Sequence, residues 1–156
     1  MPHARELAER LAPALQAPGV GVRVGIDTVS VAAIAESLAG FGDRFLARLF
    51  TDREAADARA VLGEAARLER IAARFAAKEA VIKALDLPEA GIGWREIELL
   101  RGPGGRPALA LHGRTAALAQ ALGVREWAVS ISHEREHACA VVVAVLGQAT
   151  AAAAEH

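Results

Sequence analysis

The first candidates for chemistry in this chain are two basic residues and one acidic residue of a single short segment. Among 18 lysines and arginines only two are lysines, Lys78 and Lys83, and they lie five residues apart. Glu79 precedes Lys83 by four residues, a spacing that puts both on one face of an α-helix. A compact ammonium suits a single phosphate oxygen, whereas arginine replaces lysine freely on an ordinary surface. Lysine confined to this segment therefore predicts a site for a phosphate group.

The helical pattern around Glu79 sets charges beside apolar residues. At about 100° per residue, Glu79 lies about 40° from Phe75, and Lys78 lies about 60° from it on the other side. The apolar stripe itself consists of Leu68, Ile71, Phe75 and Ile82. A carboxylate in such a stripe costs several kcal/mol unless a basic side chain, a proton or a metal ion compensates it. The alternative is a solvated Glu79–Lys83 pair on a slightly rotated helix, which stabilises a helix by only about 0.2–0.5 kcal/mol.

A second carboxylate, Asp27, ends a predicted strand. Val20, Val22, Val24 and Ile26 alternate along this strand, so Asp27 lies on the face opposite to them. By itself Asp27 could simply cap the next helix. Two carboxylates from separate elements near a lysine match the way Mg²⁺ is held, with waters and substrate phosphates completing the octahedron. Zinc is disfavoured, because Cys139 is the only cysteine and the pair His133 and His137 straddles a predicted turn.

The elements that must position these residues follow in the order β-α-α-α-β-β-α-β-β. This order predicts an α+β fold in which a mainly antiparallel sheet packs on a long helix. A first helix is expected from Ser30 to about Ala39, and Thr51 with Glu54 has the form of a capping box that opens a second one. Further helical patterns cover 55–85, with a break near Gly63, and 115–122. Strands are expected over 20–27, 97–100, 107–111, around 127–131 and over 138–146.

Length and composition limit the remaining possibilities. The 156 residues fit one main domain over 20–147, with a helical extension over 1–19 and a flexible tail over 148–156. No apolar run approaches the ~20 residues that span a bilayer, and the first ten residues are too charged for a signal peptide, so we expect a cytoplasmic protein with no membrane partner. A net charge of -1 with 4% aromatic residues disfavours an arginine-rich RNA-binding domain, so no nucleic-acid partner is expected.

Four segments of the chain together match the motifs of a known family. They are Gly25-Ile26-Asp27, residues 74–80 with Lys83, Gly105-Arg106-Pro107, and residues 129–133. In this order they resemble the holo-acyl-carrier-protein synthases, the small 4′-phosphopantetheinyl transferases, over about Val22 to Val145. The resemblance implies that the 4′-phosphopantetheine of coenzyme A is transferred to a serine of an apo acyl carrier protein, with release of adenosine 3′,5′-bisphosphate.

The resemblance also implies a role for each motif residue. Asp27 and Glu79 would hold Mg²⁺ on the pyrophosphate of coenzyme A, and Lys83 would neutralise the transferred phosphate; these three form the catalytic set. The serine proton could go to a metal-bound hydroxide or to Glu79. The residues expected to contact coenzyme A are Arg74 and His133 near the 3′-phosphate, Gly105, Arg106 and Pro107 beside the adenine, and Lys78, Lys83 and Ser132. Three roles stay open for Lys78: it could pair with the site of Glu79, reach the nucleotide, or face the carrier protein.

Family members are similar in forming homotrimers with active sites between protomers, which we therefore expect here. Many relatives carry a basic residue six positions after the motif aspartate, where this chain has Ala33. Arg44, Arg48 and Arg53 are the replacement candidates for docking the carrier protein, unless they form an ordinary solvated face. A non-catalytic carrier-binding module that keeps the fold is the alternative function. Whether the carrier serves fatty-acid or polyketide synthesis stays open.

Overall fold

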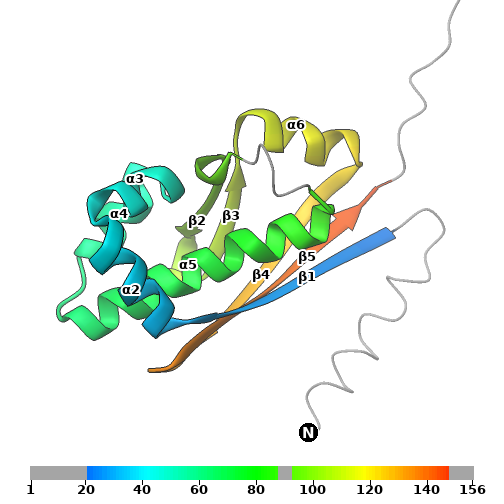
Figure 1. Ribbon diagram of the computed structural model, residues 1–156. Coiled ribbons are helices and arrows are strands. Elements are labelled where there is room, and N and C mark those ends of the chain that lie inside the picture. Colours follow the sequence, from blue (N-terminus) through cyan, green and yellow to red (C-terminus); the bar gives the residue numbers. More distant parts are fainter. Residues whose placement is uncertain (1–20, 88–92, 148–156) are drawn as a thin grey trace, which may run out of the picture.

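The computed structural model describes residues 21–87 and 93–147 of the chain (Figure 1). The expected N-terminal helix and the expected tail lie outside these residues. The helices and strands are β1 (Gly21–Ser30), α2 (Val31–Phe41), α3 (Asp43–Leu49), α4 (Asp52–Arg59), α5 (Glu64–Leu85), β2 (Ile97–Arg101), β3 (Pro107–Leu111), α6 (Gly113–Ala121), β4 (Val124–His133) and β5 (His137–Leu146). Two 3₁₀ turns, η1 (Trp94–Glu96) and η2 (Pro103–Gly105), precede β2 and β3. The α+β class is confirmed, and α3 is an additional helix.

The strands form two antiparallel sheets where one was expected. The first sheet has the order β1-β5-β4, and the second is the hairpin of β2 and β3. In the first sheet Asp27 pairs with Ala140 and Ile26 with Val141, which fixes the face of each side chain. Helices α2, α3 and α4 gather at one end of the molecule, and α6 lies at the other end beside the hairpin (Figure 1).

Local signals explain where the helices begin and end. Ser30 caps α2, because its hydroxyl accepts a hydrogen bond from the amide of Ala33. The capping box at the start of α4 is complete, since Thr51 and Glu54 each accept a hydrogen bond from the other's backbone amide. Gly63, with φ of 95°, separates α4 from α5 at the predicted break.

Helix α5 lies very close to the first sheet, and one glycine makes this possible. A Cβ atom at Gly25 would lie 1.8 Å from the carbonyl oxygen of Ala80, so only glycine fits there. The facing surfaces are also built from small residues, with Ala76, Ala80 and Ala84 on α5 and Ala138, Ala140 and Ala144 on β5. Asp27 follows Gly25 by two residues and therefore faces α5 as well.

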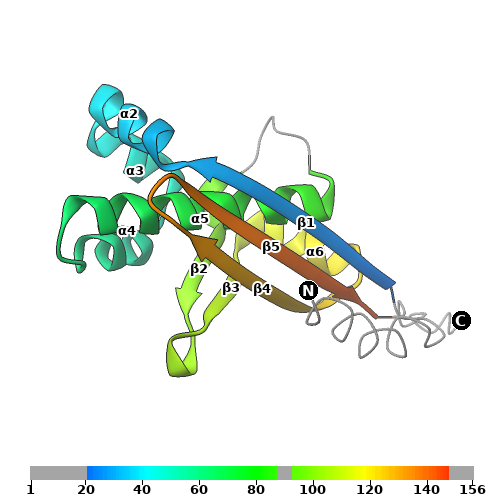
Figure 2. The same cartoon turned by 90° about the horizontal axis from the view of Figure 1, so that it is seen from below.

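The valine face of β1 lies on the opposite side from α5. Val24 and Ile26 are 59% and 56% exposed. Together with Val22 of β1 and Val141, Val143 and Val145 of β5 they form what we call the outer face of the sheet. Figure 2 shows this sheet in front of the helices, and no described helix covers its outer face. The strongest apolar alternation in β1 thus marks the exposed face, because the buried face consists of residues small enough for α5. Within residues 21–87 and 93–147 no helix has the length and hydropathy of a bilayer span.

Candidate active site

Asp27, Glu79 and Lys83 lie together between β1 and α5, as expected of a catalytic set. The ammonium of Lys83 donates hydrogen bonds to Oδ1 of Asp27 at 2.7 Å and to the carbonyl oxygen of Ile26 at 3.0 Å. The hydrogen bond with Asp27, and then the negative charges of Asp27 and Glu79, raise the pKa of Lys83 above its usual value of 10.5. The arrangement therefore holds a permanent positive charge beside two carboxylates at neutral pH.

The donor atoms of this cluster suit a hard divalent cation. Asp27 and Glu79 supply carboxylate oxygens from a strand and a helix, and both act on the same ammonium. The described residues contain no group of three or more histidine, cysteine, aspartate or glutamate side chains arranged for a metal ion. A pair of carboxylates matches the small number of protein ligands that Mg²⁺ usually has.

A basic pocket lies on another side of α5, between the helix, the β2–β3 hairpin and β4. Its volume is about 180 Å³, and it is lined by Arg70, Ala73, Arg74, Leu99, Leu100, Arg101, Gly105, Pro107, Ile131 and His133. This pocket therefore brings together four of the residues expected at the nucleotide: Arg74, Gly105, Pro107 and His133. Sequence reasoning did not single out Arg70 or Arg101. Arg70 precedes Arg74 by one helical turn, which was the available signal.

Two of the pocket's basic side chains are fixed by acidic partners. The guanidinium of Arg74 donates to Oδ2 of Asp57 at 3.1 Å and to the carbonyl oxygen of Arg70 at 3.3 Å. Burial lowers the pKa of Arg74, although the charge of Asp57 opposes this. The Nε of Arg74 is buried and has no hydrogen-bond partner among the described residues. The ring of His133 contacts Glu69 through Nδ1 at 3.0 Å.

Ser132 and Arg106 lie apart from the basic pocket. Side chains alternate along β4, so Ser132 lies on the outer face whereas its neighbour His133 faces α5. Arg106 is exposed at the hairpin turn and does not line the pocket that Gly105 and Pro107 line. Within a single chain, Ser132 and Arg106 therefore do not lie with the pocket residues that are expected to contact coenzyme A.

Lys78 corrects the expectation of a direct contact with coenzyme A. Its side chain has no exposed surface and forms an ion pair with Glu54, which is equally buried, at 2.8 Å. Burial lowers the pKa of Lys78, and the charge of Glu54 opposes this. The apolar stripe indicated that Lys78 lies against the core, but nothing in the sequence pairs it with a residue 24 positions earlier.

Two of the expected docking arginines border an apolar groove. Arg44 and Arg48 line a depression of about 420 Å³ together with Phe41, Phe45, Leu49, Phe75 and Trp94. The rings of Phe75 and Trp94 stack with their centroids 5.5 Å apart. Phe75 precedes Glu79 by one helical turn, so the groove begins beside the carboxylate cluster. Arg53 is exposed on α4 and does not line the groove.

A carboxylate pair, a lysine and a separate basic pocket together suit a ligand with several phosphate groups. A family model described as the 4′-phosphopantetheinyl transferase superfamily matches residues 23–142. The holo-[acyl-carrier-protein] synthase of Koribacter versatilis is 46% identical over 120 residues, which cover 76% of this chain and 94% of the relative. The holo-[acyl-carrier-protein] synthase of Solidesulfovibrio magneticus is 50% identical over 121 residues, which cover 77% of this chain and 94% of the relative.

Solved structures agree with this assignment. The structure of a Chronobacterium ammoniagenes ACPS–CoA complex is similar with a TM-score of 0.72 and 34% identity, over 83% of this chain and 99% of that one. The Helicobacter pylori holo-[acyl-carrier-protein] synthase in complex with coenzyme A has a TM-score of 0.67 and 29% identity, and the match covers 78% of this chain and 98% of that one. This chain belongs to the 4′-phosphopantetheinyl transferase superfamily and is a transferase of that kind, which confirms the resemblance of its motifs.

Proposed function

We propose that this chain is a Mg²⁺-dependent holo-[acyl-carrier-protein] synthase. It would transfer 4′-phosphopantetheine from coenzyme A to a serine of an apo acyl carrier protein and release adenosine 3′,5′-bisphosphate. The observation that carries the proposal is the cluster of Asp27, Glu79 and Lys83 in a chain that is 46% identical to one such synthase.

The chemistry asks for charge neutralisation and alignment more than for covalent participation by the protein. Asp27 and Glu79 would hold Mg²⁺, which supplies positive charge to the pyrophosphate when bound. The side chain of Lys83 is 52% exposed, so its ammonium can reach a phosphate oxygen from its place beside Asp27. Arg74 and His133, joined by Arg70 and Arg101, would bind the 3′-phosphate of the nucleotide.

A homotrimer with shared active sites is part of the proposal. The outer face exposes a continuous set of valine and isoleucine side chains, and apolar patches of this kind mark interfaces between proteins. Glu79 and Lys83 lie on the β1 side of α5, whereas Arg74 faces the basic pocket, about 140° around the helix from Glu79. Sites between protomers would combine the carboxylate cluster of one chain with the basic pocket of its neighbour.

The carrier protein would dock on the groove between α2, α3 and α5. Arg44 and Arg48 at its border suit an acidic helix, and the apolar floor suits a leucine, methionine or phenylalanine from that helix. Because attraction between exposed charges weakens as salt rises, the KM for the carrier should increase with ionic strength.

The direct test incubates the protein with coenzyme A, Mg²⁺ and a panel of apo acyl carrier proteins from fatty-acid and polyketide synthesis. Mass spectrometry should detect the added phosphopantetheine on at least one carrier, and none with the matched variants Asp27→Asn and Glu79→Gln. A protein that modifies no carrier would refute the proposal, and binding of a carrier without modification would favour the non-catalytic module.

A further inference from the structure

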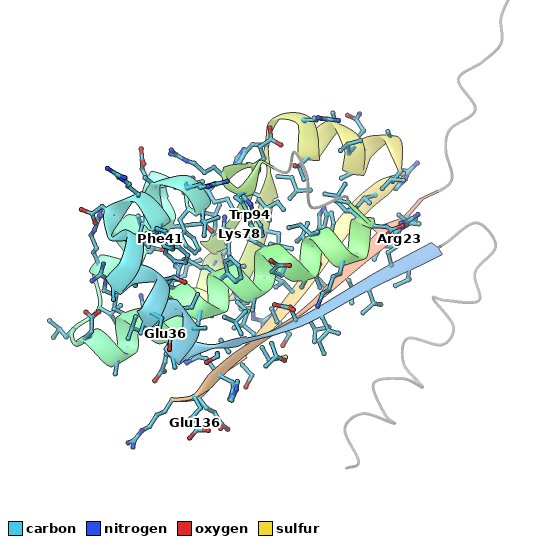
Figure 3. The ribbon with its side chains drawn as sticks, in the orientation of Figure 1. Arg23, Glu36, Phe41, Lys78, Trp94 and Glu136 are labelled. Carbon is cyan, nitrogen blue, oxygen red and sulfur yellow. The ribbon has the colours of Figure 1, made fainter. Side chains whose placement is uncertain are left out.

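Lys78 has no part in the transfer described above, yet its buried ammonium has three hydrogen-bond acceptors. Its ammonium donates hydrogen bonds to Oε2 of Glu54 at 2.8 Å, to the carbonyl oxygen of Trp94 at 3.1 Å and to the carbonyl oxygen of Ile97. An ammonium has three N–H donors, so all of them are used. Figure 3 shows Lys78 extending from α5 toward Trp94.

The three acceptors belong to three different elements. Glu54 lies on α4, Trp94 begins η1 and Ile97 begins β2. The other oxygen of Glu54 accepts a hydrogen bond from the amide of Leu99 at 3.0 Å, so the carboxylate itself also bridges α4 and β2. Lys78 therefore ties α5 to α4, η1 and β2 at once, from a side chain with no exposed surface.

This attachment lies on a different face of α5 from the carboxylate cluster. Lys78 and Glu79 are neighbours in the sequence, and at about 100° per residue they face different directions. On the β1 side, α5 packs closely on glycine and alanine, and the hydrogen bonds of Lys83 to Asp27 and to the carbonyl of Ile26 come from a side chain that is half exposed. The attachment through Lys78 adds directional bonds from a side chain with no exposed surface.

Stability is a poor explanation for keeping such a pair. The cost of removing two charges from water often exceeds the attraction between them, and apolar replacements are commonly as stable or more so. Reaction rates, in contrast, depend strongly on position, since a displacement of about 1 Å can lower a rate about 10²-fold. Trp94 is held at two points, because its carbonyl accepts a hydrogen bond from Lys78 and its indole ring stacks on Phe75 at the groove.

We propose that Lys78, with Glu54 as its partner, is a positioning residue that fixes the rotation of α5 and thereby sets Glu79 and Lys83 against Asp27. It acts through the helix and does not touch the substrate. This inference rests on the proposed transferase function, and the experiment below keeps the failure of one separate from the failure of the other.

The experiment compares three variants of the full chain, Lys78→Met, Glu54→Gln and the double variant. Lys78→Met should lower the Tm, because it leaves the carboxylate of Glu54 buried without a cation. The double variant removes both charges, so its Tm should return close to the wild-type value. Its kcat should nevertheless stay about 10-fold or more below wild type, while the KM for coenzyme A changes little.

Glu54→Gln is the conservative variant that separates positioning from folding. An amide oxygen at position 54 can still accept from the ammonium, and the bonds to Trp94 and Ile97 remain. This variant should therefore keep most of the wild-type kcat even though its Tm falls. A double variant with wild-type kcat, or a Glu54→Gln variant as slow as the double variant, would overturn the inference.

Trp94 gives a readout that does not depend on turnover. The chain has two tryptophans, so Trp127→Phe leaves Trp94 as the only one, and every variant is compared within that background. Loss of the Lys78 contact should shift the emission of Trp94 to longer wavelength and increase its quenching by acrylamide. Unchanged emission and quenching in the double variant would overturn the inference even if the wild type transferred nothing. An inactive wild type whose Trp94 signal responds as expected would refute the transferase alone.

Discussion

At the scale of single residues, Lys83 is the side chain whose surroundings bear most directly on chemistry. Its ammonium contacts Asp27 at 2.7 Å and its side chain is half exposed, so Lys83 is both fixed and accessible. Asp27 and Glu79 keep it protonated by raising its pKa. A side chain with these properties can offer a concentrated positive charge to a phosphate oxygen at any pH near neutrality.

Lys83→Arg should lower kcat by about 10-fold or more, although the charge is kept. A planar guanidinium pairs with a carboxylate through two parallel hydrogen bonds and spreads its charge, so it cannot replace a compact ammonium at one oxygen. Steady-state kinetics with coenzyme A and a carrier protein measure this. Arg59→Lys, a charge-preserving exchange at an exposed position of α4, is the control and should change nothing. Wild-type kcat in Lys83→Arg would mean that charge alone is sufficient.

The parts of the site that could be predicted were those marked by motifs or by neighbouring residues in the sequence, and the parts that could not were other contacts between residues far apart in the sequence. The cluster of Asp27, Glu79 and Lys83 was predictable, because chemistry restricts the residue types. The buried role of Lys78 was only half predictable, since the helical pattern indicated its burial but not its distant partner Glu54. The basic pocket was partly predictable from motifs, whereas Arg101 joins it only through the folding of the hairpin.

At the scale of elements, the contact between α5 and β1 depends on Gly25. The missing side chain leaves space for the carbonyl of Ala80, and this contact brings Asp27 and Lys83 within reach of each other. The starts of α2 and α4 and the position of the hairpin were predictable from caps and turn residues, whereas α6 begins at Gly113, two residues before its expected start and without a side-chain cap. The buried face of β1 was not, because its residues are small or polar and the apolar pattern lies on the other face.

Gly25→Ala should destabilise the protein by about 1–3 kcal/mol, as expected of overpacking, because its methyl group would meet backbone atoms that cannot rotate away. Gly40→Ala is the matched control within α2, where a Cβ atom meets nothing within 4 Å. That change should stabilise the protein by about 0.5–1 kcal/mol through helix propensity. Urea unfolding of both variants measures the difference, and equal effects would contradict the close approach of α5.

Glu96 makes the stability of α6 depend on pH. Hydrogen bonds from the hydroxyl and amide of Thr115 and from the amide of Arg114, at 2.8, 3.0 and 3.1 Å, hold the pKa of Glu96 below its usual 4.5. A lowered carboxyl pKa adds stability above the unfolded-state value, and this stability is lost as the pH falls through the folded-state value.

Glu96→Gln should therefore lower the free energy of unfolding at pH 7, and the difference from wild type should shrink as the pH falls below about 4.5. Urea unfolding at a series of pH values measures this difference. Glu36→Gln, at an exposed position of α2, is the control and should show no such dependence. A difference that stays constant with pH would mean that the Glu96 carboxylate does not contribute through its charge.

At the scale of the whole molecule, the outer face of the sheet is the largest departure from an ordinary protein surface. Where β1 and β5 pack on α5 through alanine and glycine, most of their larger apolar residues lie on the other side of the sheet. The chain thus has a close-packed core on one side of the sheet and an apolar surface on the other. In the proposed trimer that second surface is buried between protomers.

Val24→Glu should convert the trimer into smaller species and abolish transfer, because a carboxylate would be buried in the interface without a partner. Light scattering measures the mass, and the carrier assay measures the activity. Leu62→Glu is the control, since Leu62 is 96% exposed and lies outside the sheet. A Val24→Glu protein that keeps the wild-type mass would exclude the outer face as the interface.

The contrast between the two lysines also makes the chain suitable for chemical footprinting. Lys78 is enclosed in protein, while the side chain of Lys83 is 52% exposed. An amine-reactive reagent should therefore modify the folded protein at one lysine side chain only. Bound coenzyme A should protect that lysine if it occupies the proposed site. The rate of labelling, followed by peptide mass spectrometry, would then report ligand binding beside Asp27 without a carrier protein.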